Sequence, residues 1–205
     1  MESDLYIPGN VIYTDRYSIK TSNDTGSQII AGSTTHSGYQ EGTGSAARFN
    51  YIYGFTQISS TQIVVSDTSN VCLRLVDRVS GRTLQFSGQC RKGGYQDGSP
   101  ALFSDPRSII KDVKKPDQLI VADSSNNALR SVNLKARVVS TLVKSDVYLA
   151  RISQDEQSGD LFLIAGNQIL RFIYRNNKVQ LVTGSEASGY ADGYLHIACL
   201  PIHQH

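Results

Sequence analysis

The stretch Ile63–Arg74, Ile-Val-Val-Ser-Asp-Thr-Ser-Asn-Val-Cys-Leu-Arg, decides the fold of this chain because it occurs twice. It returns as Leu119–Arg130, Leu-Ile-Val-Ala-Asp-Ser-Ser-Asn-Asn-Ala-Leu-Arg, 56 positions further on. Each copy has an apolar run, a short polar stretch and a second run, a pattern typical of two strands joined by a tight turn. Such self-similarity at a fixed period indicates a repeat architecture, in which neighbouring units bury one another's apolar faces.

The rest of the chain repeats the same order of loops and strands around these copies. Gly38–Gly42 and Gly94–Gly98 are related loops that open two full units. Four strands are expected in each full unit, near residues 53–58, 62–66, 71–76 and 83–86, and again near 107–111, 118–122, 128–133 and 138–143. We therefore divide the chain into an incomplete unit at 1–33, full units at 36–88 and 91–145, a degenerate unit at 146–184 and the start of another at 186–205.

The two incomplete units carry fewer strand signals. In the first, strands are expected at residues 5–7, 11–14 and 28–31; in the degenerate unit they are expected at 161–164, 168–173 and 178–182.

Composition indicates a turn-rich, all-β protein and excludes several kinds of partner. Among 205 residues, 17 are glycine and 5 are proline, and the net charge of +2 comes from dispersed residues. A nucleic-acid site would need clustered Lys and Arg, so no nucleic-acid partner is expected. No apolar run approaches the roughly 18 residues of a membrane span. The polar start Met1–Asp4 is not a signal peptide, so the protein is cytoplasmic or the chain lacks its true N-terminus.

The pattern resembles the NHL-repeat family. The residues that carry the resemblance are Asp97–Phe103, Leu119–Asp123, Asn126–Arg130 and Val139–Thr141, and the likeness covers most of residues 36–184. The resemblance implies an all-β fold over residues 1–205, a β-propeller with NHL-type four-stranded blades. Since propellers close with about 4–8 blades, and the chain stops where an inner strand should begin, we expect an incomplete ring or a fragment of a larger propeller.

An Asn-x-x-x-Arg pair accompanies the repeat, at Asn70/Arg74, Asn126/Arg130 and Asn167/Arg171. In the first unit, Asn10 is matched by Thr14 in the place of the Arg. The structural interpretation is that the preceding aspartates accept turn N–H groups and each guanidinium fork ties neighbouring loops together. The alternative is a ring of arginines that contacts a ligand, so Arg74 and Arg130 are also candidate binding residues.

Three tyrosines recur in the opening loops, at Tyr39, Tyr95 and Tyr190. Tyrosine is favoured at binding sites because it is large and has few rotamers. Loops 34–45 and 91–100 are therefore the predicted contact surface. The alternative is that these tyrosines pack between blades.

Two cysteines and a sequon bear on the compartment. Cys72 and Cys90 lie opposite each other on a hairpin that turns near Ser80–Gly81, so a disulfide between them is plausible; the alternative is two unrelated small apolar residues. Asn23-Asp-Thr25 is a glycosylation sequon on a turn-like stretch. Together they favour an extracellular, secreted protein, and the alternative is a cytoplasmic one with reduced thiols.

These patterns predict a non-enzymatic binding or scaffold module, extracellular or matrix-associated, with a protein or glycan ligand. No catalytic, cofactor or metal site is assigned, since one acid per blade (Glu41, Asp97 and Asp192) does not surround a calcium ion. The alternative is a metal-dependent lyase or hydrolase with its active site in the propeller channel. The one observation that favours this alternative is that His36 and His196 occupy similar loops, from which they could bind a metal ion.

Overall fold

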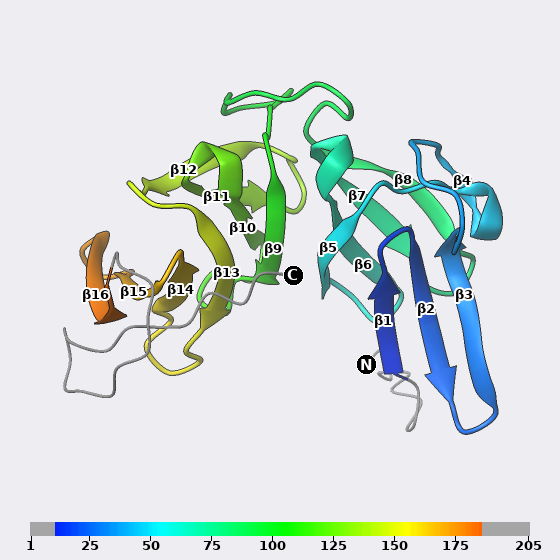
Figure 1. Cartoon of the computed structure of the whole chain (residues 1–205), viewed down its shortest axis with the longest axis horizontal. Coiled ribbons are helices and arrows are strands. Elements are labelled where there is room, and N and C mark those ends of the chain that lie inside the picture. The colour runs from blue at the N-terminus through cyan, green and yellow to red at the C-terminus, as the bar shows by residue number, and fades with distance from the viewer. Residues whose placement is uncertain (1–10, 186–205) are drawn as a thin grey trace.

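The computed structural model describes residues 11–185, which form four antiparallel sheets (Figure 1). The first sheet contains β1 (Val11–Asp15), β2 (Ser18–Asn23) and β3 (Gly26–Gly32). The second has the order β4-β8-β7-β6-β5, with bounds β4 (Gly42–Thr43), β5 (Ile52–Gln57), β6 (Gln62–Asp67), β7 (Cys72–Asp77) and β8 (Arg82–Ser87).

The third and fourth sheets contain four strands each. The third consists of β9 (Pro106–Lys111), β10 (Gln118–Asp123), β11 (Ala128–Asn133) and β12 (Val139–Lys144). The fourth consists of β13 (Leu149–Gln154), β14 (Leu161–Ala165), β15 (Gln168–Ile173) and β16 (Lys178–Gly184). The strands expected in the two repeat copies are all present. Three short 3-10 turns complete the secondary structure, η1 (Gly44–Ala46), η2 (Thr68–Asn70) and η3 (Ser124–Asn126).

Two strands of the structure, β2 and β13, were not predicted from the sequence. β2 has only one apolar residue, Ile19, which is fully buried, so its sequence shows no clear alternation. β13 also lacked a strand signal, although its Leu149 and Ile152 are buried. The strand expected at residues 5–7 and the unit expected from residue 186 lie outside the described residues.

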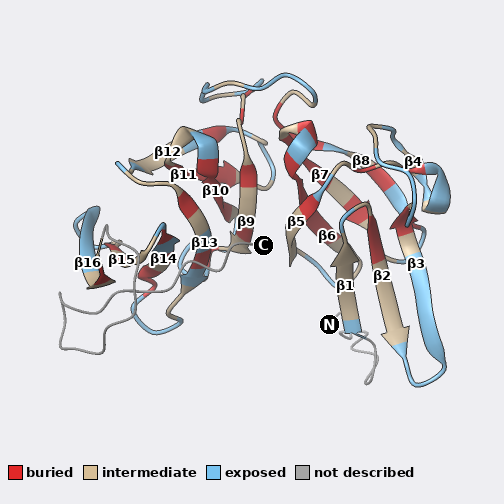
Figure 2. Cartoon of the chain, in the orientation of Figure 1, coloured by how far each residue is buried: buried red, intermediate tan, exposed pale blue. Residues whose placement is uncertain are grey.

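The four sheets follow one another around an arc (Figure 1). The first strands of successive units meet on its inner side, where β5 contacts β9 and β9 contacts β13. Three apolar clusters fill the spaces between neighbouring sheets, and buried residues concentrate in the middle strands of the second and third sheets, β6, β7, β10 and β11 (Figure 2). Phe49, Phe103 and Phe172 are the largest apolar side chains that are fully buried. Each sheet is therefore buried against the next one, as the repeat requires.

The opening loops close the outer edges of two sheets. β4 pairs with β8, and Gly98 makes an isolated bridge with Val139 of β12. An uncovered edge strand would present unpaired N–H and C=O groups to other chains. The loop that opens each full unit therefore also protects the last strand of that unit.

Within residues 11–185, no helix is long and apolar enough to cross a membrane.

Candidate functional site

Arg74 and Arg130 occupy equivalent, fully buried positions in the second and third sheets. Arg130 donates to Asp123 Oδ2 at 2.7 Å and to the carbonyls of Leu102 and Gln96 at 3.2 and 2.8 Å. It also donates to Asp97 Oδ1 at 2.7 Å. The bonds to Leu102, Gln96 and Asp97 tie the strand pair to the segment that opens the same unit.

The copy in the second sheet is built from the matching residues. Arg74 donates to Asp67 Oδ2 at 3.1 Å, to Arg48 O at 3.4 Å and to Gln40 O at 3.1 Å. This geometry favours the structural interpretation of the repeated arginines, because buried guanidinium groups that are bound on several sides offer little to a ligand.

The aspartate and asparagine of each copy complete the cluster. Asn70 donates to Asp67 Oδ2 and to Gly38 O, each at 2.8 Å, and the backbone N–H of Asn50 donates to Asp67 Oδ1. Burial raises the pKa of Asp67 to about 6, although the hydrogen bonds from Asn70 and Asn50 and the charge of Arg74 lower it. Asn126 and Asp123 repeat these contacts in the third sheet.

The turn residues also join neighbouring sheets. Thr68 Oγ1 donates to Pro106 O at 2.7 Å, and the Ser124 hydroxyl donates to Leu149 O. Both acceptors are inner-strand residues of the following sheet. The repeated turn therefore sets the position of the next inner strand.

The third predicted pair, Asn167/Arg171, does not reproduce this cluster. Arg171 donates to Asp160 Oδ2 at 2.6 Å, and its side chain is 42% exposed. Leu170 lies at the register position of Arg74 and Arg130, since all three follow the register shift in the pairing with the last strand of their sheet. Because successive side chains of a strand point to opposite faces, Arg171 faces away from the position of the buried arginines.

The first sheet also corrects the sequence alignment. Lys20 lies at the same register position, after the shift between Ile19 and Lys20. Its Nζ donates to Asp15 Oδ2 at 2.7 Å. Thr14, which the sequence pattern placed in the position of the Arg, lies one residue before Asp15, and Asn10 lies outside the described residues.

Tyr39 and Tyr95 cover the two buried arginines. The ring centre of Tyr95 lies 4.9 Å from the guanidinium carbon of Arg130, and Tyr95 shares a hydrogen bond of 2.8 Å with Thr141. The ring centre of Tyr39 lies 4.7 Å from the guanidinium carbon of Arg74, and the Tyr39 hydroxyl donates to Gln85 Oε1. Tyr190 lies outside the described residues.

The structure contains a disulfide between Cys72 and Cys90, whose Cα atoms are 4.9 Å apart. It links the start of β7 to the loop after β8. Asn23 is exposed in the hairpin between β2 and β3, where its Oδ1 accepts hydrogen bonds from the backbone N–H and the hydroxyl of Thr25.

A second set of polar residues lies on the inner side of the arc, at β-bulges. Register shifts place Tyr53 and Gly54 of β5 opposite one residue of β6, and place Arg107 and Ser108 of β9 opposite one residue of β10. β13 has the same irregularity between Leu149 and Arg151. Bulges redirect side chains and are common beside functional sites.

A pocket of about 270 Å³ lies at these bulges. Its lining comes from four strands: Thr14, Tyr53, Gly54, Phe55, Ser108, Ile109, Arg151 and Ile152. Gly54 allows β5 and β9 to approach closely, because a Cβ there would lie 2.9 Å from Arg107 O.

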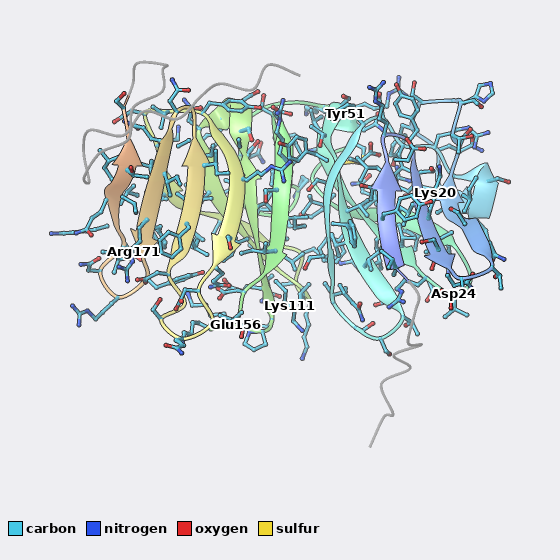
Figure 3. The ribbon with its side chains drawn as sticks, turned by 60° about the horizontal axis from the view of Figure 1, so that its bottom comes forward. Lys20, Asp24, Tyr51, Lys111, Glu156 and Arg171 are labelled. Atoms are coloured by element: carbon cyan, nitrogen blue, oxygen red, sulfur yellow. A yellow bond between two sulfur atoms is a disulfide. The ribbon has the colours of Figure 1, made fainter. Side chains whose placement is uncertain are left out.

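In the view of Figure 3, Tyr51, just before β5, lies at the end of the sheets opposite Lys111 and Glu156.

Arginine and tyrosine side chains form a network around the pocket. The ring centre of Tyr53 lies 4.9 Å from the guanidinium carbon of Arg107 and 5.8 Å from that of Arg151. Asp105 Oδ2 accepts hydrogen bonds from Arg107 and from the hydroxyl of Tyr148, both at 2.9 Å. Burial lowers the pKa of Arg107, but Asp105, Tyr148 and Tyr53 together raise it more, so that the net shift is upward. Burial and the bond to Asp105 raise the pKa of Tyr148 to about 12.

This arrangement can bind an anion by charge and hydrogen bonding. Arg107 is compensated by Asp105, whereas Arg151 is exposed and pairs with no carboxylate in residues 11–185. Over the same range, no group of three or more His, Cys, Asp or Glu residues could hold a metal ion.

The sequence repeat did not identify this pocket. Tyr53 and Arg107 occupy equivalent positions of the repeat, since each is the first of the two bulged residues of its inner strand. Their residue types differ, so the repeat shows no shared motif at this position. The bulges depend on how the strands pair, and this pairing has no local signal in the amino-acid sequence. Adjacent aromatic and basic residues in inner strands were the only available indication.

Comparison with solved structures shows the fold. A nidogen–laminin complex matches with a TM-score of 0.62 and 11% identity, over 85% of this chain and 61% of that one. An auxiliary nutrient binding protein from Bacteroides ovatus matches with a TM-score of 0.64 and 12% identity, over 93% of this chain and 43% of that one. A virginiamycin B lyase from Staphylococcus aureus matches with a TM-score of 0.55 and 14% identity, over 84% and 51%.

These similar structures include β-propellers, and this chain spans 43% to 61% of their lengths. No family model and no curated protein matches the sequence.

Proposed function

We propose that this chain is a non-enzymatic binding module built on an NHL-type β-propeller, with its binding surface on the inner side of the arc. The observation that carries the proposal is the pocket at Tyr53, Ser108 and Arg151, where three successive inner strands all bulge. Sites placed on a rigid scaffold of strands hold their groups in position for recognition.

The NHL-type assignment is supported by the repeated cluster of aspartate, asparagine and arginine. It recurs with the same partners in two sheets and joins each turn to its own opening loop. We propose that the four described sheets are blades of an incomplete propeller ring, which the open arc and the partial coverage of similar structures support.

We propose a binding surface different from the one expected in the opening loops. Tyr39 and Tyr95 are held against buried arginines and hydrogen-bonded within their own sheets. We assign them to packing. The partner is proposed to be a protein.

We place the module outside the cell, on the basis of the Cys72–Cys90 disulfide and the exposed Asn23 sequon. Expression through a secretory pathway should give a product whose mass falls on treatment with an N-glycosidase. Thr25→Ala should abolish this mass change. A secreted wild-type product without glycan would contradict the modification of Asn23.

Site-specific photo-crosslinking tests the binding surface. A photoreactive phenylalanine analogue replaces Phe55 in the pocket or, as the control, Val79, which is 81% exposed in the turn between β7 and β8. Each protein is irradiated with the secreted and matrix proteins of the cells that produce it. We expect a discrete adduct from position 55 alone. Equal adducts from both positions, or none from position 55, would overturn the proposal.

A further inference from the structure

We infer that the inner pocket receives a carboxylate from an extended acidic peptide, with Arg151 as the residue that binds it. This inference rests on the proposed function, because it names the ligand of the same surface. The positive charge of Arg151 in the pocket lining indicates the class of ligand.

Arg151 is the uncompensated charge of the pocket. Four arginines of the described chain pair with aspartates, among them the neighbouring Arg107 with Asp105. Arg151 contacts only the Tyr53 ring among the charged and aromatic groups of residues 11–185. Its guanidinium therefore keeps the planar donor fork that fits a carboxylate in two parallel hydrogen bonds.

The remaining lining groups suit the same ligand. None of the eight lining residues is acidic. Thr14 and Ser108 supply hydroxyl groups beside Arg151, and the Ser108 oxygen already accepts from the Ile152 N–H at 3.1 Å. The Ser108 O–H donor therefore remains for an anionic oxygen, since a hydroxyl can donate one bond while it accepts others.

The bulges favour a peptide as the source of the carboxylate. Tyr53, Gly54 and Ser108 lie at bulges that interrupt the ladders of two neighbouring sheets, and an extended chain in the pocket would run past these bulges. An acidic sugar would use the face of an aromatic ring, but the Tyr53 ring already has two guanidinium groups within 6 Å of its centre. The pocket volume of about 270 Å³ accommodates a single acidic side chain.

Fluorescence polarisation tests this inference with peptides of defined charge. The probes are labelled peptides of about eight residues, long enough to lie across neighbouring strands, in which serine alternates with Glu, Gln or Lys. We expect only the Glu peptide to bind, with an affinity that falls as salt rises. Arg151→Ala should weaken binding about tenfold or more, as expected when a hydrogen bond to a charged group is lost.

Arg175→Ala is the matched control, because Arg175 is exposed in the turn between β15 and β16 and the variant removes the same charge. It should change the affinity by less than about twofold. Arg151→Lys should restore only part of the affinity, since it keeps the charge and loses the fork. Equal losses in the Arg151→Ala and Arg175→Ala variants would reduce the effect to net charge and overturn the inference.

The same assay separates the ligand class from the binding surface. A glucuronic acid oligosaccharide that binds through Arg151, while the Glu peptide does not, would overturn the peptide assignment. If neither probe binds but position 55 crosslinks to a partner, the ligand inference fails and the proposed surface stands. If the Glu peptide binds through Arg151 but no partner crosslinks, the proposed function fails for the secreted proteins tested.

Discussion

Replacing Arg130 with methionine tests whether the repeated arginine holds the third sheet together. Methionine keeps an unbranched apolar side chain that replaces the stem of the arginine, and it removes the charge and all donors. The change leaves the fully buried Asp123 without its cation and takes partners from the carbonyls of Leu102 and Gln96. The ring of Tyr95 also loses the guanidinium against which it lies.

The expected loss is about 4 kcal/mol in the free energy of unfolding. Removing one member of a buried ion pair costs about 3–5 kcal/mol, because the remaining charge is left uncompensated. A domain of this kind has a total stability of about 5–15 kcal/mol, so the variant should fold but lie close to instability. With a urea dependence of about 2 kcal/mol per molar, the unfolding midpoint should fall by about 2 M.

Urea unfolding at pH 7, followed by far-ultraviolet circular dichroism, measures this loss. The matched control is Arg171→Met, which makes the same chemical change to an arginine that is 42% exposed and pairs with Asp160. Its loss should be less than about half of the loss in Arg130→Met, because solvent reaches Arg171 and screens this pair, although Asp160 itself is buried.

Equal losses in the two variants would refute the argument that burial makes the repeated arginine structural. A loss below about 1 kcal/mol in Arg130→Met would do the same, since this is the scale of an exposed ion pair.

Three further changes test the turns and loops. Reduction of the Cys72–Cys90 disulfide, which joins residues 18 positions apart, should lower the free energy of unfolding by about 3 kcal/mol; urea unfolding with and without reductant measures it, and an unchanged midpoint would contradict it. Val71→Asn should raise stability by about 1 kcal/mol, because Val71 has a left-handed φ of 53° where the other repeat has Asn127; thermal unfolding that shows a loss would contradict it. Burial raises the pKa of Asp97, but hydrogen bonds from Thr141 and Arg130 lower it more, so the net pKa lies below 3.8. Its ionised form therefore stabilises the fold above that pH and the benefit disappears on acidification; urea midpoints of Asp97→Asn and wild type should converge below pH 3.8, and a gap that widens there would contradict the sign.

The structural role of the buried arginine cluster could be predicted from the sequence, because most of its residues lie close together in the chain. Asp67, Asn70 and Arg74 fall within one strand-turn-strand segment, and their spacing returns unchanged in Asp123, Asn126 and Arg130. The same spacing rule was wrong for Arg171, because the turn before β15 is shorter. Ala165 pairs with Gln168 three positions later, whereas Asp67 pairs with Cys72 five positions later. A shift of one residue in register exchanges the two faces of a strand.

The all-β architecture and its repeat follow from the sequence, since periodicity and turn residues act locally. The positions of β2 and β13 emerge only in the folded chain, because their few apolar residues become buried only against neighbouring sheets. The folded chain also forms the inner pocket, which joins Thr14, Tyr53, Ser108 and Arg151 from four strands of four sheets. Such proximity depends on the packing of successive sheets and on bulges in their inner strands, and neither is encoded by neighbouring residues in the chain.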